Sequence, residues 1–245
     1  MEEISLKAEE LFSISGFHFT NGLLLTLVAS LVLISFALFF RAKIKMVPGK
    51  LQCAVEMGVE ALLGLMESTL GSMEKAEKYF PLIATIFIFI LTSNLLGIFP
   101  GVGSMTFESA HGDVPLFRSP AADLNFTLAF AVISVILTNI IGMASVGTFK
   151  HLGKYFNFKG PIDFFIGILE MISELAKIIS LSFRLFGNVF AGEVLLTIIS
   201  FLAPYFMPLP FLFLEVFVGA IQAFIFATIT LVSISLHTVA HDEGH

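Results

Sequence analysis

Long apolar segments alternate with short polar ones along the chain, and their lengths predict helices that cross a membrane. These segments cover residues 22–40, 81–99, 124–149, 162–202 and 204–239. A helix needs about 20 mainly apolar residues to span a bilayer, and each segment is close to that length or longer. The pattern therefore predicts an all-α integral membrane protein with five transmembrane helices, which form one membrane domain over residues 1–245.

The segment 51–73 has a different pattern, because acidic and amide side chains recur among its apolar residues near helical spacing. These side chains are Gln52, Glu56, Glu60 and Glu67. We interpret the segment as an amphipathic helix that lies at the membrane interface. Its polar face is acidic, whereas such helices usually carry basic residues there, so a short extra span stays open as an alternative.

The last two apolar segments are too long for upright spans. A helix of 38 residues is about 57 Å long at about 1.5 Å per residue, against a hydrocarbon core of about 30 Å. Residues 162–203 contain no proline, so we predict strongly tilted helices rather than broken ones. Pro204, Pro208 and Pro210 mark the turn between them, because proline does not continue a helix interior. Residues 160–240 are predicted to form a two-helix ion-path hairpin.

Basic residues in the polar segments predict the orientation. With five spans and one interfacial helix, one side receives Arg41, Lys43, Lys45, Lys50, Lys75, Lys78, Lys150, Lys154 and Lys159. The other side keeps Lys7 and Arg118. Cytoplasmic loops are the ones rich in Lys and Arg, so we predict an external N-terminal segment at 1–21, an external loop at 101–123 and a cytoplasmic C-terminus. The acidic start lacks the basic n-region of a signal peptide.

The composition agrees with a chain solvated mostly by lipid. Hydrophobic residues make up 57% of it and charged residues 13%, whereas a soluble domain carries about a quarter charged residues. The net charge of −6 argues against nucleic acid as a partner. The single cysteine, Cys53, excludes an internal disulfide. The chain has no G-x-x-x-x-G-K-[ST] phosphate loop, so we expect no nucleotide site and no cofactor.

Six ionisable residues lie inside the last two apolar segments, and each would cost about 2.5–3.5 kcal/mol at a helix centre. They are Glu170, Glu174, Lys177, Arg184, Glu193 and Glu215. Such residues must face one another, a partner or water, and they mark ion pathways by default.

The spacing of the polar residues is ordered. Steps of 3, 4, 3, 4 and 4 residues place one polar stripe along a helix, made of Glu170, Ser173, Lys177, Ser180, Arg184 and Asn188. Glu193 comes nine residues after Arg184, about two and a half turns, so it points to the opposite side. Glu215 and Gln222 share a face of the next helix, and Gly219 between them leaves room for a close neighbour or water.

Simpler explanations exist for several of these residues. Arg184 could be an anchor whose guanidinium reaches the headgroups. Glu170, Glu174 and Lys177 could form an ordinary ion pair one turn apart. The serines of the stripe could bond backbone carbonyls. Glu193 and Glu215 have no basic residue within a turn, so a structural salt bridge explains them poorly.

Three histidines near the C-terminus have a spacing that can bind a metal in a helix. They are His237, His241 and His245. The glutamate of an H-E-x-x-H protease helix is missing, since Thr238 follows His237. We therefore interpret this tail as a solvated internal terminus without a metal.

The run from 181 to 193, LSFRLFGNVFAGE, resembles subunit a of F-type ATP synthases, whose motif is S-x-R-L-x-x-N-x-x-A-G-x around an essential arginine. Three further stretches are similar to that family: NLLGIFP at 94–100, ADLNFT at 122–127 and LEVFVGAIQAF at 214–224. The resemblance covers the chain from about Phe80 onward, and the residues before it agree in layout only.

The resemblance implies a role for each matching residue. Arg184 would face the ring carboxylates of subunit c, and Glu193 would line an outer half-channel. Glu215 matches a position that is histidine in some members and acidic in others, so any tuning by that histidine differs here. Gln222 and Asn188 match polar residues near the arginine.

The remaining matches concern the inner half-channel and the partners. Glu170 matches an acidic residue toward that half-channel, with Ser173 beside it, and Ser180 matches a small polar residue one turn from the arginine. The implied partners are the c-ring, peripheral-stalk subunit b and lipid, with ATP chemistry left to other chains. A bacterial plasma membrane is the simplest location, and the residues leave proton and sodium both open, with the proton favoured.

Three other classes of protein fit the residues less well. A self-sufficient transporter needs a second matching half, and the chain shows one polar stripe and no internal repeat. An intramembrane protease needs a nucleophile and base at membrane depth, whereas the histidines lie at or beyond span ends. A structural scaffold has no need of Glu193 and Glu215 in apolar helices.

Overall fold

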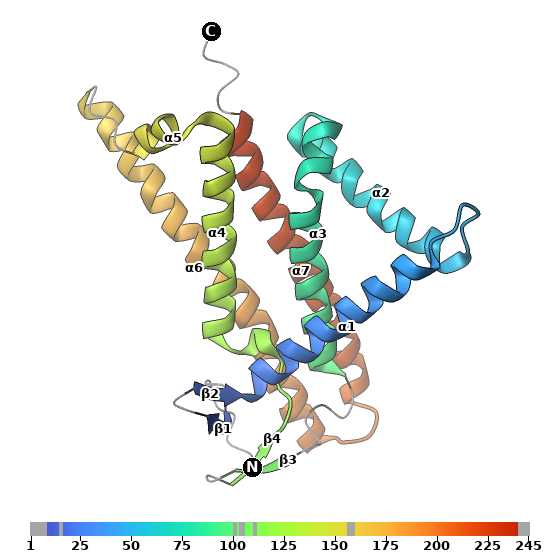
Figure 1. Ribbon diagram of the computed structural model, residues 1–245. Coiled ribbons are helices and arrows are strands. Elements are labelled where there is room, and N and C mark those ends of the chain that lie inside the picture. The colour runs from blue at the N-terminus through green and yellow to red at the C-terminus, as the bar shows by residue number, and fades with distance from the viewer. Residues whose placement is uncertain are drawn as a thin grey trace.

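The computed structural model describes residues 9–14, 17–99, 102, 106–109, 112–155 and 160–239, and helices dominate it (Figure 1). In chain order the α-helices are α1 Asn21–Lys43, α2 Lys50–Leu70, α3 Met73–Ile98, α4 Leu124–Val146, α5 Thr148–Tyr155, α6 Pro161–Leu202 and α7 Pro208–Val239. Five of them, α1, α3, α4, α6 and α7, are long and apolar enough to cross a membrane. The predicted all-α membrane fold with five spans is therefore confirmed.

Side-chain caps start two of the spanning helices. The hydroxyl of Thr20 accepts a hydrogen bond from the backbone N–H of Leu23 at 3.3 Å, and α1 begins there. The carboxylate of Asp123 accepts from the N–H of Asn125 at 2.9 Å at the start of α4. Such caps satisfy N–H groups that have no partner inside the helix.

The helix α2 follows the predicted amphipathic segment, and it is not among the five candidate spans. Met66 and Leu70, near its end, are buried, whereas most of the helix is exposed. It ends at Gly71, whose φ of 73° lies in the left-handed region that favours glycine. Figure 1 shows α1 and α2 meeting at a corner that lies away from the other helices.

Two helix boundaries differ from the prediction for local reasons. The helix α3 begins at Met73, before the apolar segment at 81–99, and contains Pro81 in its interior. The third apolar segment breaks at Gly147, whose φ is 96°, and α5 follows as a separate short helix. A glycine adopts this backbone conformation without a steric penalty.

Two short β-hairpins, which the sequence analysis did not predict, lie together at one end of the molecule (Figure 1). The first pairs β1 Glu10–Ile14 with β2 Phe17–Thr20, and the second pairs β3 Thr106–Ser109 with β4 Gly112–Pro115. Asn21 at the start of α1 donates from Nδ2 to the carbonyl of Pro115 at 3.3 Å. The described parts of the 1–21 segment and of the 101–123 loop therefore share one end, as predicted.

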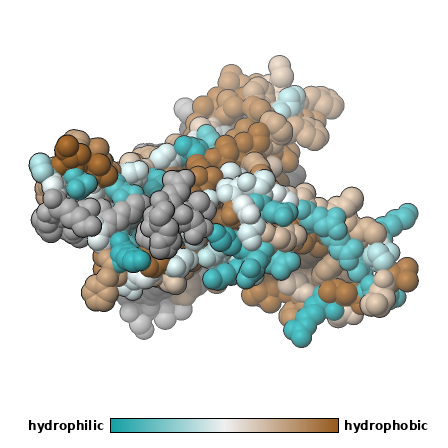
Figure 2. Space-filling view, turned by 90° about the horizontal axis from the view of Figure 1, so that it is seen from above, coloured by the Kyte–Doolittle hydropathy of each residue, from teal (hydrophilic) through white to brown (hydrophobic). Residues whose placement is uncertain are grey.

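The end of α7 lies at the opposite end of the molecule, beside α5 and the α2–α3 corner (Figure 1). Figure 2 looks onto this second end and shows hydrophilic residues gathered across it, with hydrophobic residues mainly at the margins. Lys75 and Lys78 of α3 and Lys150 of α5 belong to these elements. Which end faces the cytoplasm stays a prediction.

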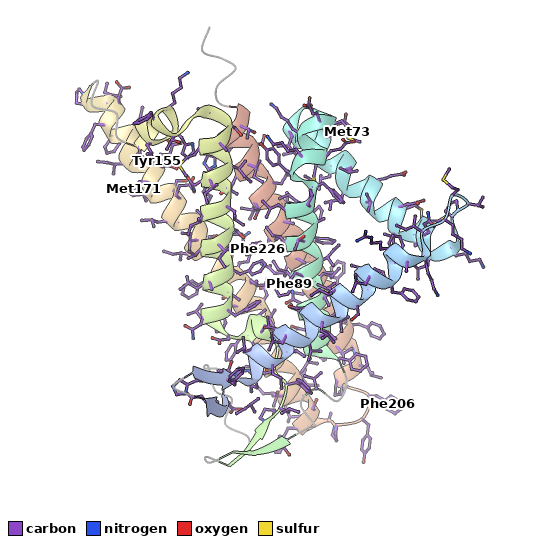
Figure 3. All side chains as sticks on the ribbon, viewed as in Figure 1. Met73, Phe89, Tyr155, Met171, Phe206 and Phe226 are labelled. Atoms are coloured by element: carbon purple, nitrogen blue, oxygen red, sulfur yellow. The ribbon has the colours of Figure 1, made fainter. Side chains whose placement is uncertain are left out.

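The core lies between α3, α4, α6 and α7. Phe226 of α7 is fully buried, and its ring centroid is 5.6 Å from that of Phe130 on α4, which stacks on Phe89 of α3 at 5.6 Å. Figure 3 shows Phe89 and Phe226 in the middle of the helix layer. In Figure 1, α6 and α7 cross α3 and α4 obliquely, and their tilt relative to a membrane stays a prediction. This core fixes the positions of the polar residues on α6 and α7.

Candidate functional site

Arg184 lies on an exposed face of α6. Its Nη2 donates a hydrogen bond to the hydroxyl of Ser180, one turn earlier, at 3.2 Å. Leu181 and Leu185 on the other side of the helix are buried in the core. Phe183, the residue before the arginine, is 54% exposed. The helix therefore presents one guanidinium within an apolar surface that points away from the rest of the chain.

Glu193 is on the same helix, and the structure pairs it with Arg118. The Nε atom of Arg118 is 3.3 Å from Oε1 and 3.4 Å from Oε2 of Glu193. The prediction that a salt bridge explains Glu193 poorly is therefore wrong. It considered basic residues within a helix turn, whereas Arg118 comes from a loop 75 residues earlier. Arg118 is buried, and it is a site residue that the sequence analysis treated only as a loop charge.

Glu215 on α7 is buried beside α6. Its carboxylate occupies the space that a Cβ at Gly192 would need, so the absence of a side chain at this position admits the acid. Glu215 and Glu193 both line a cavity of about 500 Å³. Arg118 and Ser119 also line it, together with the end of α3. The structure thus brings the two predicted acids together in one hollow, at the end of the molecule that carries the hairpins.

Asn188 and Gln222 form a second predicted pair that the structure brings together. The Nδ2 atom of Asn188 donates to Oε1 of Gln222 at 2.9 Å across the α6–α7 contact. The side chain of Gln222 is buried, and its Nε2 has no hydrogen-bond partner among the described residues. The space predicted beside Gly219 is filled by Asn94, whose Nδ2 donates to the carbonyl of Gly219 at 3.1 Å.

A third polar group gathers around Glu174, near the other end of α6. The Nζ atom of Lys177 donates to Oε1 of Glu174 at 2.6 Å, which is the ion pair that the sequence analysis left open. The Nε2 atom of His237 is 3.4 Å from the same oxygen. Asn139 of α4 donates from Nδ2 to Oε2 of Glu174 at 3.4 Å.

The prediction of a solvated C-terminal tail is wrong for His237. The helix α7 continues through Val239 and packs on α4, so the imidazole of His237 is buried. The spacing of the three histidines does not record the packing of α4 that covers this one. His241 and His245 lie outside the described residues.

The last two predicted site residues lie on the outer part of α6. Ser173 is exposed and Glu170 is half-buried. Burial, together with the nearby carboxylates of Glu174 and Glu170, raises the pKa of Tyr155 on α5 to about 12. Glu170 therefore acts on the same polar region as Glu174. Within the ranges that the structure describes, no group of three or more His, Cys, Asp or Glu residues is placed to hold a metal ion.

Comparison with known proteins shows which protein family this chain resembles. The family model described as ATP synthase A chain matches residues 23–235. The ATP synthase subunit a of Campylobacter concisus is 37% identical over 233 residues, which are 94% of this chain and 92% of that protein.

Two relatives from other bacteria carry the same name and match most of the chain. The ATP synthase subunit a of Mycobacterium bovis is 37% identical over 232 residues, 92% of this chain and 90% of that protein. The protein of the same name from Moorella thermoacetica is 32% identical over 232 residues, 95% of this chain and 97% of that protein. The matched region contains the first two polar groups described above and all of the third except His237, and the chain belongs to the ATP synthase A chain family.

Proposed function

We propose that this chain is the stationary proton-translocating subunit of a rotary ATP synthase, with two offset half-channels and with Arg184 facing the carboxylates of a c-ring. The observation that carries the proposal is the placement of Arg184. Its guanidinium lies on an outer, apolar face of α6, where a charge facing lipid would cost about 2.5–3.5 kcal/mol on the insertion scale. A partner carboxylate removes that cost, and a ring of such carboxylates fits the family.

The first half-channel is proposed at the cavity that Glu193 and Glu215 line. The cavity lies at the hairpin end, and its volume of about 500 Å³ is large enough for several waters. Carboxylates with water access are suited to relay protons. Asn188 and Gln222 lie on the same two helices, and the amide Nε2 of Gln222 supplies a further polar atom between the cavity and Arg184.

The second half-channel is proposed at the opposite end, past Glu170 and Ser173. Both belong to the stripe that leads along α6 through Ser180 to Arg184. The two half-channels then approach Arg184 from opposite ends of the 160–240 hairpin, and neither passes the arginine directly.

Arg184 supplies the chemistry that keeps the two half-channels apart. Arginine is effectively never deprotonated in a protein, so it does not carry a proton from one side to the other. A ring carboxylate that arrives at Arg184 releases its proton, because an opposite charge favours the ionised form. A carboxylate that leaves for lipid must be neutral, so it takes a proton from the other half-channel. The membrane potential drives this proton transfer, and it contributes about 2.3 kcal/mol for each charge that crosses per 100 mV.

The surroundings of the chain are part of the proposal. Its relatives are bacterial, so we place it in a bacterial plasma membrane with the N-terminus outside and the C-terminus cytoplasmic. The exposed apolar side chains of α1, such as Leu31 and Leu38, suit lipid or a membrane partner. We expect the c-ring and the peripheral-stalk subunit b as protein partners, as in the family that the motifs resemble.

ATP-driven proton pumping in inverted membrane vesicles that carry the whole complex tests this proposal. We expect Arg184→Ala to reduce pumping to background while the assembled complex still hydrolyses ATP. Arg41→Ala is the matched control, because Arg41 lies at the exposed end of α1. Pumping by Arg184→Ala at the wild-type rate would overturn the proposal and leave Arg184 as a membrane anchor.

A further inference from the structure

We propose that His237 and Glu174 form a second proton-binding site, which exchanges protons with the half-channel at the C-terminal end of the bundle. This inference rests on the proposed function and adds a residue, His237, that neither the sequence motifs nor the family match assigns. The site lies near the end of α7 and the beginning of α6. The cavity of Glu193 and Glu215 lies at the other end of the same two helices.

The two nitrogens of His237 determine how many protons the site holds. Nδ1 is 3.3 Å from the backbone carbonyl of Thr138, and a carbonyl only accepts, so Nδ1 carries a hydrogen. Nε2 is 3.4 Å from Oε1 of Glu174, and a carboxylate also only accepts. Nε2 and Oε1 therefore attract each other only when one exchangeable proton lies between them. Loss of that proton leaves two lone pairs facing each other.

The neighbours of Glu174 place that proton on the imidazole. Lys177 already donates to Oε1 at 2.6 Å, and Asn139 donates to Oε2 at 3.4 Å. A carboxylate that accepts hydrogen bonds from an ammonium group and an amide N–H is stabilised in its ionised form. The exchangeable proton is then held by His237 as an imidazolium.

The orientation of Asn139 is fixed from α5. Because the pKa of Tyr155 is raised to about 12, its hydroxyl keeps its proton and donates to Oδ1 of Asn139 at 2.9 Å. The Nε2 atom of His151 is 3.1 Å from the same oxygen, so it also donates. The amide nitrogen of Asn139 is thereby directed to two acceptors, the carbonyl of Val135 at 2.9 Å and the carboxylate of Glu174 at 3.4 Å. Figure 3 shows Tyr155 beside the first turns of α6, at the end of the molecule where this site lies.

Among the described residues, the charged and titratable groups with contacts around His237 come from α5 and α6. The helix α6 contributes Glu174 and Lys177, with Glu170 one turn earlier. The helix α5 contributes His151, whose ring centroid is 5.2 Å from that of His237, and Tyr155. From α4, the contacts described are the carbonyl of Thr138 and the amide of Asn139. Nε2 of His237 thus faces an acceptor, Oε1 of Glu174, with the ammonium of Lys177 on the same oxygen.

Lys177 connects the buried pair to the proposed path. It belongs to the stripe of Ser173, Ser180 and Arg184, seven residues before the arginine, and its side chain is partly exposed while that of His237 is almost fully buried. A proton that leaves His237 passes Glu174 and reaches the exposed surface of α6 beside Lys177. Buried ion pairs are often no better than apolar residues for stability alone, which favours a functional reason for this cluster.

The pH profile of ATP-driven pumping tests the site in the whole complex. Inverted vesicles expose the C-terminal end to the bath under the predicted orientation, so the bath pH is varied from 5.5 to 8.5 as a condition of the assay. Pumping is divided by the ATP hydrolysis of the detergent-released catalytic sector at the same pH. The variants are His237→Gln, which keeps an N–H donor opposite Glu174, and His237→Lys, which keeps a cation there. His18→Gln is the control, since His18 is an exposed histidine on the first hairpin.

We expect both variants to lower normalised pumping by about tenfold and to make it depend less on bath pH. This loss is smaller than the roughly 10²- to 10⁴-fold rate contribution that is typical of a positioned proton-transfer group. His18→Gln keeps the wild-type profile. A wild-type profile in either assembled variant would overturn the inference. A uniform loss of pumping that leaves the shape of the pH profile unchanged would also overturn it, since that result indicates a structural role.

Arg184→Ala in the same assay separates this inference from the proposed function. If Arg184→Ala pumps normally, the proposed function fails. If Arg184→Ala is inactive and the His237 variants pump like wild type, only this inference fails.

Discussion

The carboxylate of Glu215 lies against the backbone of Gly192, in the space that a Cβ at position 192 would occupy. This contact joins α6 and α7 one residue before Glu193, and it places two acids at one cavity. The motif A-G-E at 191–193 thus has a physical reason: the glycine makes room for an acid from the neighbouring helix.

Gly192→Ala is expected to displace the carboxylate of Glu215 and leave the fold intact. The colliding atoms are at the tip of a flexible side chain, and alanine is favoured over glycine inside a helix. A displacement of about 1 Å at a reacting group can cost up to about 100-fold in rate, so we predict a 10- to 100-fold loss of ATP-driven pumping, as an order of magnitude. Gly64→Ala on the exposed face of α2, where nothing lies within 4 Å, is the control and pumps normally. Normal pumping by Gly192→Ala would show that the position of Glu215 is unimportant.

Arg118→Gln tests the ion pair with Glu193. The guanidinium is 3.3 Å from one carboxylate oxygen and 3.4 Å from the other, so its loss removes the cation that balances Glu193 at the cavity. We predict slower pumping and a lower thermal unfolding temperature of the complex. Residues that act as one unit are not additive, so Arg118→Gln with Glu193→Gln is predicted to be no worse than the poorer single variant. Additive losses in the double variant would contradict a functional pair.

Cross-linking tests whether the face of Arg184 meets the ring. In a Cys53→Ser background, Ser180→Cys is expected to form a disulfide with a cysteine placed near the ring carboxylate, because a disulfide requires Cα atoms within about 7 Å. Ser182→Cys is the matched control, since Ser182 is buried and its hydroxyl contacts Thr127 at 3.1 Å. Equal yields at 180 and 182, measured by gel electrophoresis, would argue against the proposed face.

The hydrogen bond from Asn188 to Gln222 offers a way to separate stability from transport. Asn188→Leu leaves the buried Oε1 of Gln222 without its donor, and an unsatisfied buried group costs about 1–3 kcal/mol. We predict that Asn188→Leu lowers the unfolding temperature of the complex and that Gln222→Leu in addition restores it. Pumping is predicted to stay low in the double variant, because both polar atoms are gone. A double variant that regains both properties would remove these residues from the proton path.

The features that follow helical periodicity could be predicted from the sequence. Steps of three and four residues placed Ser180 and Arg184 on one face, where the structure joins them at 3.2 Å. The same period placed Glu193 away from Arg184, and Glu215 with Gln222 on α7. Periodicity is a local property of a helix, so the sequence alone is enough to assign these faces.

The features that depend on contacts between distant segments could not be predicted in this way. Arg118 reaches Glu193 across 75 residues, and His237 reaches Thr138 across 99. Arg118 belongs to no periodic polar face, and the spacing of the histidines at His237 suggested only a metal site, so no pattern indicated either partner. The hairpins and the break at Gly147 were missed because they are set by a few residues of backbone geometry, which a hydropathy pattern does not record.

The central claim is that Arg184 separates two proton-accessible regions, and passive proton conductance tests it most directly. The measurement uses vesicles that carry the whole complex, without nucleotide, so that the ring does not turn, and a potassium diffusion potential drives the protons. The account predicts that wild type and Arg41→Ala stay tight, whereas Arg184→Ala conducts protons through joined half-channels. A passive proton conductance in Arg184→Ala vesicles that equals that of wild-type vesicles would contradict the claim that this arginine is the barrier.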